Sequence, residues 1–260
     1  EQIADRGLTF IRKKDSRNIP LYFVANLGNT FREGWIKMGA GTLVHQDKPP
    51  SGQSLMQTRM KDGAYEVFLR LPPGESTFLA QAGDGSDIAF VNRVPKEMEI
   101  QGNWELTFLS GKPSLPAPAK LTALKSWTTL PDSAEYFSGK ARYRIVFDLK
   151  GPLKQYEGAG ISLGDVREVA SVKLNGKDLG TVWHIPFRLY AGEALKSKGN
   201  VLEIEVTNLS ANYMRLRDQQ QPDWKKFYDI NIVDITYKKF DATRWQPMPS
   251  GLLGPVKLIY

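Results

Sequence analysis

Hydrophobic and polar residues alternate along several stretches of this chain, which is the pattern of a β-strand with one buried face. Between residues 141 and 149 an apolar side chain recurs at every second position, and the same period holds over 170–174 and 202–206. Successive side chains of a strand point to opposite faces, so an apolar period of two places one face in a core. We therefore expect a strand in each of these three segments.

A hairpin is predicted over residues 168–183. Asn175-Gly176 interrupts the alternation there, and this pair tolerates the positive φ angles of a type I′ turn. Turn-rich pieces separate further strand-like runs, namely 8–12, 21–25, 34–38, 64–71, 76–81, 97–100, 104–109 and, at the end, 256–260. Short strands with Gly and Pro between them favour antiparallel sandwiches, so the predicted fold class is all-β.

A proline-rich stretch suggests where the chain divides. Residues 111–119 contain three prolines, which lack a backbone donor and resist incorporation into a sheet. We predict two β-sandwich domains, 1–113 and 116–260. Within the second, the segment 209–248 lacks the period of two and is rich in Tyr, Trp, Arg and Asp, with a turn or two of helix expected over 208–217. Long excursions of this kind often carry function.

Composition removes several classes of protein. The 260 residues include no cysteine and only two histidines, so disulfides, thiolate chemistry and His-rich metal sites are excluded. No apolar run approaches the roughly 20 residues of a membrane span. The net charge of +7 is spread in short doublets rather than gathered on one segment, so we expect no nucleic-acid partner.

Five strings occur in an order and spacing that resemble the galactose-binding-like jelly roll, the sugar-binding domain of glycoside hydrolase family 2. They are Tyr136-Phe-Ser-Gly-Lys-Ala-Arg-Tyr143, Leu163-Gly-Asp-Val166, Val172-Lys-Leu-Asn-Gly-Lys-Asp-Leu-Gly180, Trp183-His-Ile-Pro-Phe187 and Asn200-Val-Leu-Glu-Ile-Glu-Val-Thr-Asn208. The ending Pro249-Ser-Gly-Leu-Leu-Gly-Pro-Val256 resembles the C-terminal region of the alpha-L-rhamnosidases of glycoside hydrolase family 106.

The first half resembles the segment that joins the catalytic barrel of those rhamnosidases to their last sandwich, through Phe10-Ile-Arg-Lys13, Leu21-Tyr-Phe-Val-Ala-Asn26 and Leu71-Pro-Pro-Gly-Glu-Ser76. The resemblance covers residues 8–260. In that family the catalytic carboxylates lie in an N-terminal (β/α)₈ barrel, which takes about 250 residues. This chain has no alternating strand–helix pattern, so the resemblance implies a C-terminal portion of a glycosidase or a standalone relative of it.

Glycoside hydrolysis needs two carboxylates across the scissile bond. The candidate pairs are Glu97/Glu99, Glu203/Glu205 and Asp84/Asp87, and the first two lie on the polar faces of predicted strands. We therefore predict no catalytic residue. The residues 83–87 offer carboxylates to a cation but lack the further ligands of a full calcium loop, so no cofactor or metal is predicted. A structural calcium held by backbone carbonyls, as in related jelly rolls, leaves no trace in a sequence.

Aromatic residues offer the chemistry for sugar binding, because the C–H faces of sugars stack on apolar rings. The predicted carbohydrate-binding residues are Trp183, His184, Asn212, Arg215, Asp218 and Trp224. Trp183 and His184 follow a strand, Arg215 and Trp224 lie in the excursion, and the resemblance implies an Asn…Asp pair at Asn212 and Asp218. The alternative is that these side chains only fix the excursion to the sandwich. Trp104 and Trp127, in contrast, are expected in the core.

The leading expectation is a non-catalytic, carbohydrate-associated module of a glycoside hydrolase resembling the alpha-L-rhamnosidases. It would support an upstream catalytic domain and contact an oligosaccharide or a plant or host glycan. The resemblance implies an enzyme as the parent protein, whereas we expect no activity from this chain alone. The alternatives are a standalone glycan-binding protein and a purely structural interface domain. Because the substrates of such enzymes are extracellular glycans, we expect a periplasmic or secreted location.

Overall fold

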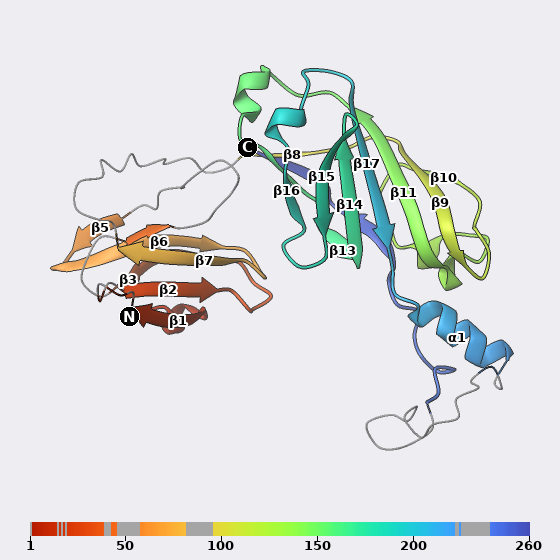
Figure 1. Ribbon diagram of the computed structural model, residues 1–260, viewed down its shortest axis with the longest axis horizontal. Coiled ribbons are helices and arrows are strands. Elements are labelled where there is room, and N and C mark those ends of the chain that lie inside the picture. Colours follow the sequence, from red (N-terminus) through yellow and green to blue (C-terminus); the bar gives the residue numbers. More distant parts are fainter. Residues whose placement is uncertain are drawn as a thin grey trace. The chain divides into compact units, whose positions relative to one another are not determined.

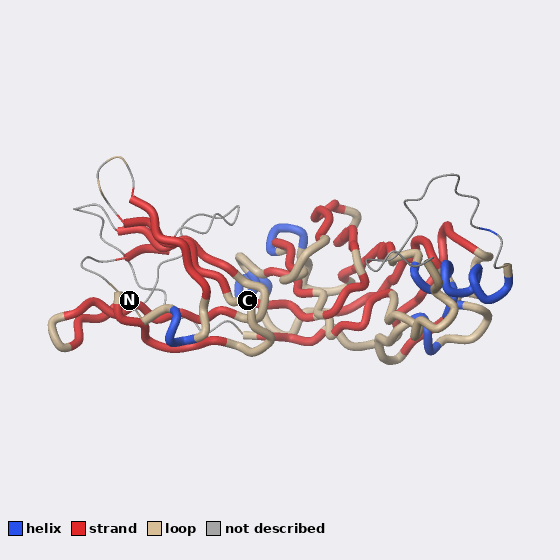
Figure 2. Tube along the Cα trace, turned by 90° about the horizontal axis from the view of Figure 1, so that it is seen from below, coloured by secondary structure: helices blue, strands red, loops and turns tan. Residues whose placement is uncertain are grey.

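A computed structural model describes residues 2–14, 16, 18, 20–38, 43–45, 58–81, 96–221, 224 and 240–260. The chain forms two compact units, Glu1–Lys96 and Glu97–Tyr260. Figure 2 shows strands running through the described chain of both units and short helical segments between them. The expectation of an all-β fold built from antiparallel sandwiches is confirmed. Among the described residues, no helix is long and apolar enough to cross a membrane.

Unit 1 is built from two antiparallel sheets around one core. The first has the order β1-β2-β7-β4 and the second the order β3-β6-β5. Their bounds are Thr9–Lys14 (β1), Pro20–Ala25 (β2), Arg32–Lys37 (β3), Leu43–His45 (β4), Thr58–Lys61 (β5), Ala64–Leu71 (β6) and Ser76–Gln81 (β7). Tyr22 and Val24 from one sheet and Ile36, Val67 and Leu69 from the other pack into a single buried cluster. The short helix η1 (Ala4–Arg6) precedes β1.

Unit 2 contains a six-stranded sheet with the order β10-β9-β11-β17-β14-β15 (Figure 1). Its strands are Trp104–Lys112 (β9), Ala119–Leu121 (β10), Ser138–Phe147 (β11), Val169–Leu174 (β14), Lys177–Val182 (β15) and Asn200–Thr207 (β17). Buried and more exposed residues alternate along β11, β14 and β17, as their apolar period of two predicts. The 175–176 turn of the β14–β15 hairpin has φ angles of 54° and 80°, so both predicted positive values are present.

A second layer of unit 2 is the four-stranded sheet with the order β16-β12-β19-β8. Its strands are Glu97–Glu99 (β8), Gly160–Ser162 (β12), Arg188–Tyr190 (β16) and Lys257–Ile259 (β19), and β13 (Asp165–Arg167) pairs separately with β18 (Gly251–Gly254). Side chains of both layers form one buried cluster, which makes the unit a sandwich. The helical segments are η2 (Trp127–Thr129), η3 (Ala134–Tyr136), η4 (Leu153–Tyr156), η5 (Gly192–Ala194) and α1 (Ala211–Gln220).

The units divide at Lys96/Glu97, not between residues 113 and 116 as the proline-rich stretch suggested. The reason is that β9 pairs with both β10 and β11, so the chain before and after the prolines belongs to one sheet. The prolines lie in the connection between two neighbouring strands of that sheet, after β9 ends at Lys112 and before β10 begins at Ala119. Strand β8 likewise belongs to unit 2, because it pairs with β19.

The core of unit 2 is fixed by a buried aromatic group. Trp127 and Tyr143 are fully buried, and the Trp127 Nε1–H donates a hydrogen bond of 2.6 Å to the Tyr143 hydroxyl. The backbone N–H of Leu252 donates to the same hydroxyl at 3.0 Å. These two bonds join η2, β11 and β18 at one point. Trp104 is 2% exposed, so the expectation that Trp104 and Trp127 lie in the core is confirmed.

Candidate functional site

The C-terminal ends of strands β15 and β17 lie at the same end of the six-stranded sheet. Val206 of β17 pairs with Ala170 of β14, and Ala170 pairs with Val182 of β15. Since neighbouring strands lie about 4.8 Å apart, the ends of β15 and β17 are separated by roughly 10 Å. The loop that carries Trp183 and the segment that leads into α1 therefore leave one end of the sandwich (Figure 1).

The loop between β15 and β16 presents an exposed aromatic pair. Trp183 is 69% exposed, and its ring lies perpendicular to the ring of His184 with 5.0 Å between centroids. The His184 Nδ1 lies 3.0 Å from the carbonyl oxygen of Ile185. Ile185 is also exposed, at 59%. The indole ring offers an apolar face on which the C–H groups of a sugar can stack, and the ring nitrogens of both side chains can form hydrogen bonds with its hydroxyls.

Further apolar side chains are exposed around α1. They are Leu209, Met214, Trp245 and Met248, with exposed fractions of 50%, 37%, 39% and 40%. Scattered exposed apolar residues are ordinary on a protein surface, whereas a gathering of them points to contact with another molecule. Trp183 and Ile185 of the β15–β16 loop are exposed as well, so exposed apolar side chains lie both in that loop and around α1.

Asn212 and Asp218 of α1 are buried and bonded within the chain. Asn212 is 2% exposed, donates to the carbonyl oxygen of Met248 at 2.8 Å and accepts from the Met248 N–H at 2.8 Å. Asp218 is 3% exposed and accepts from Trp224 Nε1 at 2.6 Å and from the Ala242 N–H at 2.7 Å. The structure thus uses both side chains, and the indole N–H of Trp224, to connect α1 with the chain around it. This is the alternative that the sequence left open.

Arg215 of α1 faces η3. Its Nη1 donates to Glu135 Oε1 at 2.9 Å, and its guanidinium lies 5.8 Å from the ring centroid of Tyr136. The Arg215 side chain is 17% exposed. Arg217, on the same helix, lies 5.0 Å from the ring of Trp224. These contacts are those of side chains that hold a helix in place, so the structure does not bring Arg215 and Trp224 together with Trp183.

The candidate carboxylate pairs lie on the polar surface. Glu205 accepts from Arg142 at 2.7 Å and lies 3.6 Å from Lys140. The hydrogen bond from Arg142, together with the two positive charges, lowers the pKa of Glu205 below its usual value. Glu97 pairs with Lys257 at 2.8 Å. A carboxylate kept ionised by cations is unsuited to donate a proton, so Glu205 does not have the character of a glycosidase acid.

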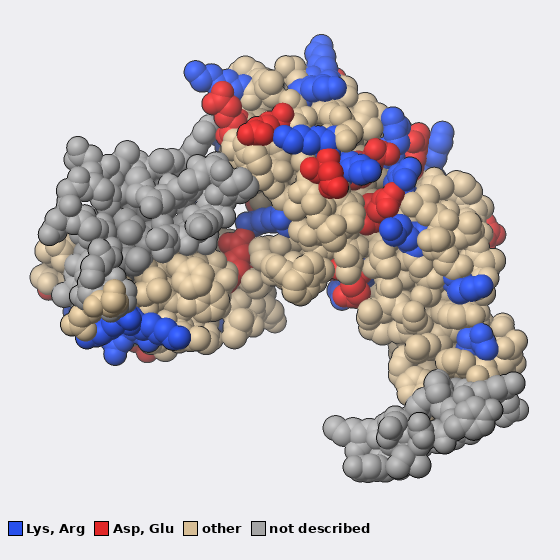
Figure 3. All heavy atoms as spheres, in the orientation of Figure 1, with Lys and Arg blue, Asp and Glu red and all other residues tan. Residues whose placement is uncertain are grey.

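The third candidate carboxylate pair, Asp84 and Asp87, lies outside the described residues. Within the described part of the chain there is no group of three or more His, Asp and Glu side chains arranged to hold a metal. Figure 3 shows acidic and basic side chains interspersed over the visible face of unit 2, which is a mixed rather than a strongly basic surface.

No family model matches the chain. The comparisons nevertheless relate it to glycoside hydrolases. A rhamnosidase from Novosphingobium sp. PP1Y has a structure similar to 97% of this chain, at a TM-score of 0.69 and 25% identity. A protein from Formosa agariphila, provisionally named as a beta-glucuronidase, is 31% identical over 191 residues, or 65% of this chain. The chain spans 24% of the rhamnosidase and 16% of the Formosa protein, so it matches one part of much longer proteins.

Proposed function

We propose that this chain is a non-catalytic, carbohydrate-associated module of a glycoside hydrolase of the alpha-L-rhamnosidase type. In this proposal unit 2 is a galactose-binding-like jelly roll, and both units support a catalytic barrel in the same exported polypeptide. The observation that carries the proposal is the similarity to the Novosphingobium rhamnosidase, since it extends over 97% of the chain and therefore takes in both units. Similarity to two consecutive domains of one glycosidase is stronger evidence of a relationship than similarity to a single common fold would be.

The absence of catalysis is supported by the chemistry of the described carboxylates. Glu205, which is partly buried, and Glu97, which is exposed, are both ion-paired on the surfaces of strands. A hydrolytic centre instead needs two carboxyl groups facing each other across a cleft at a separation of roughly 5–10 Å. The test is hydrolysis of 4-nitrophenyl α-L-rhamnoside and 4-nitrophenyl β-D-glucuronide by the purified chain. We expect no release above a heat-denatured control, and steady turnover would refute the non-catalytic role.

Within this proposal, glycan contact falls to Trp183 and His184. Their exposure supports the assignment, because a ring that is 69% exposed loses water from its face when a sugar stacks on it. Asn212 and Asp218 are buried, so they support the loop-bearing end of the sandwich rather than contact the glycan. The binding residues proposed here are therefore fewer than the six that the sequence suggested.

A glycan array followed by calorimetry tests the binding role. With the best array ligand, we expect Trp183→Ala to weaken binding about tenfold, the loss of one stacked aromatic contact. Trp245→Ala is the matched control, since Trp245 is also exposed (39%) but lies beside α1. An unchanged affinity in the Trp183 variant, or an equal loss in both variants, would refute the assignment.

A second candidate is a structural interface module that binds no glycan. The exposed apolar side chains around α1 favour it, because Leu209, Met214 and Met248 would be covered by an adjoining domain. Hydrogen exchange of α1 distinguishes the two roles when the isolated chain is compared with a longer polypeptide that includes the catalytic domain. Protection of α1 only in the longer polypeptide, with no ligand on the array, would favour the structural role.

A further inference from the structure

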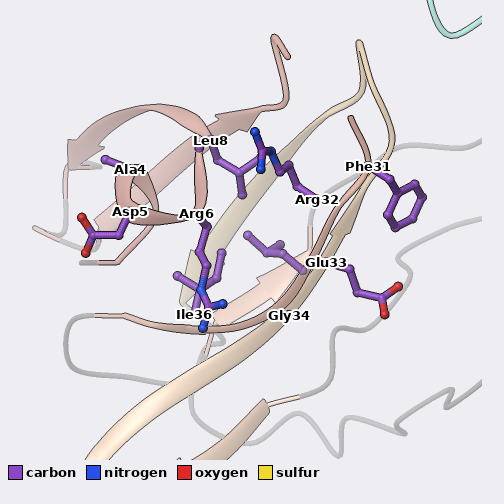
Figure 4. Close-up of a pocket in the computed structure, with 11 residues that line it drawn as sticks. Ala4, Asp5, Arg6, Leu8, Phe31, Arg32, Glu33, Gly34 and Ile36 are labelled. Atoms are coloured by element: carbon purple, nitrogen blue, oxygen red, sulfur yellow. The ribbon is translucent and has the colours of Figure 1, made fainter. Parts of the chain in front are cut away.

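Unit 1 contains a pocket of about 500 Å³ between η1 and the beginning of β3 (Figure 4). Its apolar wall is made by Leu8, Ile36 and Leu69, which are all nearly completely buried. Two basic side chains also line it, Arg6 of η1 and Arg32 of β3. The volume falls within the range of roughly 300–1,000 Å³ that small-molecule sites occupy. The pocket is thus large enough for one sugar residue.

The side chain of Arg32 makes no hydrogen bond and no ion pair within the described part of the chain, and its buried Nε lacks a partner. A buried donor without an acceptor is uncommon in a folded protein and calls for an explanation. Gly7 makes room for this side chain, because a Cβ at Gly7 would lie 2.9 Å from Arg32 Nη2. The same glycine has a φ of +70°, which L side chains rarely adopt.

The acidic residues at the pocket do not neutralise Arg32. Glu33 pairs with Arg70, with 3.2 Å between Oε2 and Nε. In Figure 4 the carboxylates of Asp5 and Glu33 point away from the Arg32 guanidinium. Arg6 donates from Nη2 to the Trp35 carbonyl oxygen at 3.3 Å, and no carboxylate among the described residues forms an ion pair with it. The pocket therefore carries an excess of positive charge.

We propose that this pocket binds the oxyanion of an acidic saccharide, a uronate carboxylate or a sulfate ester, with Arg32 as its main partner. A planar guanidinium matches the two oxygens of such a group, and partial burial strengthens the attraction. Arg6 lies where it can donate to a hydroxyl or a second anionic group of the same ligand. Phe31 at the rim is 45% exposed and gives the sugar an apolar neighbour. Only the choice of a saccharide rests on the function proposed above.

Titration calorimetry of the whole chain with D-glucuronate, glucose 6-sulfate, glucose and inorganic sulfate tests the proposal. We expect binding of glucuronate or of glucose 6-sulfate, and whichever binds identifies the anionic group. Glucose should not bind detectably, and inorganic sulfate should bind more weakly than the saccharide that carries the anion. Failure of both acidic sugars to bind, or equal binding of glucose, would overturn the proposal. Equally tight binding of inorganic sulfate would overturn its saccharide part.

Arg32→Gln should weaken binding of the acidic sugar at least tenfold, since a charge-assisted pair is lost. The matched control is Arg144→Gln, which removes an exposed arginine of unit 2 and changes the net charge equally. Equal loss in both variants would overturn the proposal. NMR of the unchanged chain is independent of variant folding, and the acidic sugar should shift the amides of Gly7 and Gly34. Trp183→Ala should leave this binding intact, which separates the site from the one proposed on unit 2.

Discussion

Gly251 lies in the core of unit 2, where a single added methyl group should strongly destabilise the fold. Its φ is +94°, and a Cβ there would lie 2.5 Å from Trp127 Nε1 and 2.6 Å from the Tyr143 hydroxyl. Both distances are far below the 3.4 Å at which ordinary van der Waals contact begins. The two aromatic groups cannot retreat easily, because their mutual hydrogen bond and the bond from Leu252 hold them.

The magnitude follows from two separate costs. A non-glycine residue in the left-handed region costs roughly 1–2 kcal/mol. Overfilling a packed core costs roughly 1–3 kcal/mol more. Gly251→Ala should therefore lower the free energy of unfolding of unit 2 by about 2–5 kcal/mol. For a unit of this size, that corresponds to a fall in Tm of roughly 5–15 °C.

Urea unfolding followed by tryptophan fluorescence measures this loss, since Trp104 and Trp127 are buried in unit 2. Gly176→Ala is the matched control, because Gly176 has a φ of +80° and nothing within 4 Å of an added Cβ. That variant reports the backbone cost alone, and the difference between the two variants reports the clash. A Gly251 variant no less stable than the Gly176 variant would refute the packing argument.

Four further outcomes are expected. Tyr143→Phe leaves two buried donors unpaired and should cost about 2–4 kcal/mol by urea unfolding. Burial raises the pKa of Tyr143 above its ordinary value near 10, so its contribution to stability is complete below pH 10 and is lost as the pH rises further; the Phe variant should show a shallower alkaline decline. Glu205→Gln should change the free energy of unfolding by less than about 1 kcal/mol, because its partners are exposed, and its contribution disappears as the pH falls below about 4.3. Asn212→Ala should cost about 2–3 kcal/mol, since it removes the buried bonds to Met248, and a cost under 0.5 kcal/mol would contradict that role. Trp183→Ala should leave the Tm within about 2 °C of the unchanged chain, because the ring is mostly exposed.

The period of two identified the long strands because burial in a sandwich acts on every second residue. Strands β11, β14 and β17 show this, and the 64–71 strand matches β6 in both bounds. Strands β12, β13 and β16 have only three residues each, too few for a period to appear. They are fixed by pairing with strands distant in the sequence, as when β12 pairs with β19.

The sequence predicted the exposure of one candidate site residue but not the roles of the others. Trp183 lies directly after β15, and its exposure agrees with its position beyond a strand end. The sequence does not distinguish whether Asn212 and Asp218 contact a ligand or other parts of the chain, because polar side chains in a long loop serve both roles. The partners Met248 and Ala242, 36 and 24 residues away, decide between the two, and only the folded chain places them. No sequence motif predicts the pocket that contains Arg32, because η1 and β3 are separate in the sequence and come together only in the folded unit.

The pairing of β8 with β19 determines when unit 2 can complete its folding during synthesis. Strand β19 lies inside its sheet, between β12 and β8, although it comes from residues 257–259. While the ribosome is still making the segment before it, β8 and β12 each lack a neighbour and expose unpaired edges. The described sheets of unit 1 pair strands β1 to β7 only with one another, so their pairing can be completed before β8 is made. The four-stranded sheet of unit 2 must instead wait for β19, so it stays open until residues 257–259 have been made and have left the ribosome.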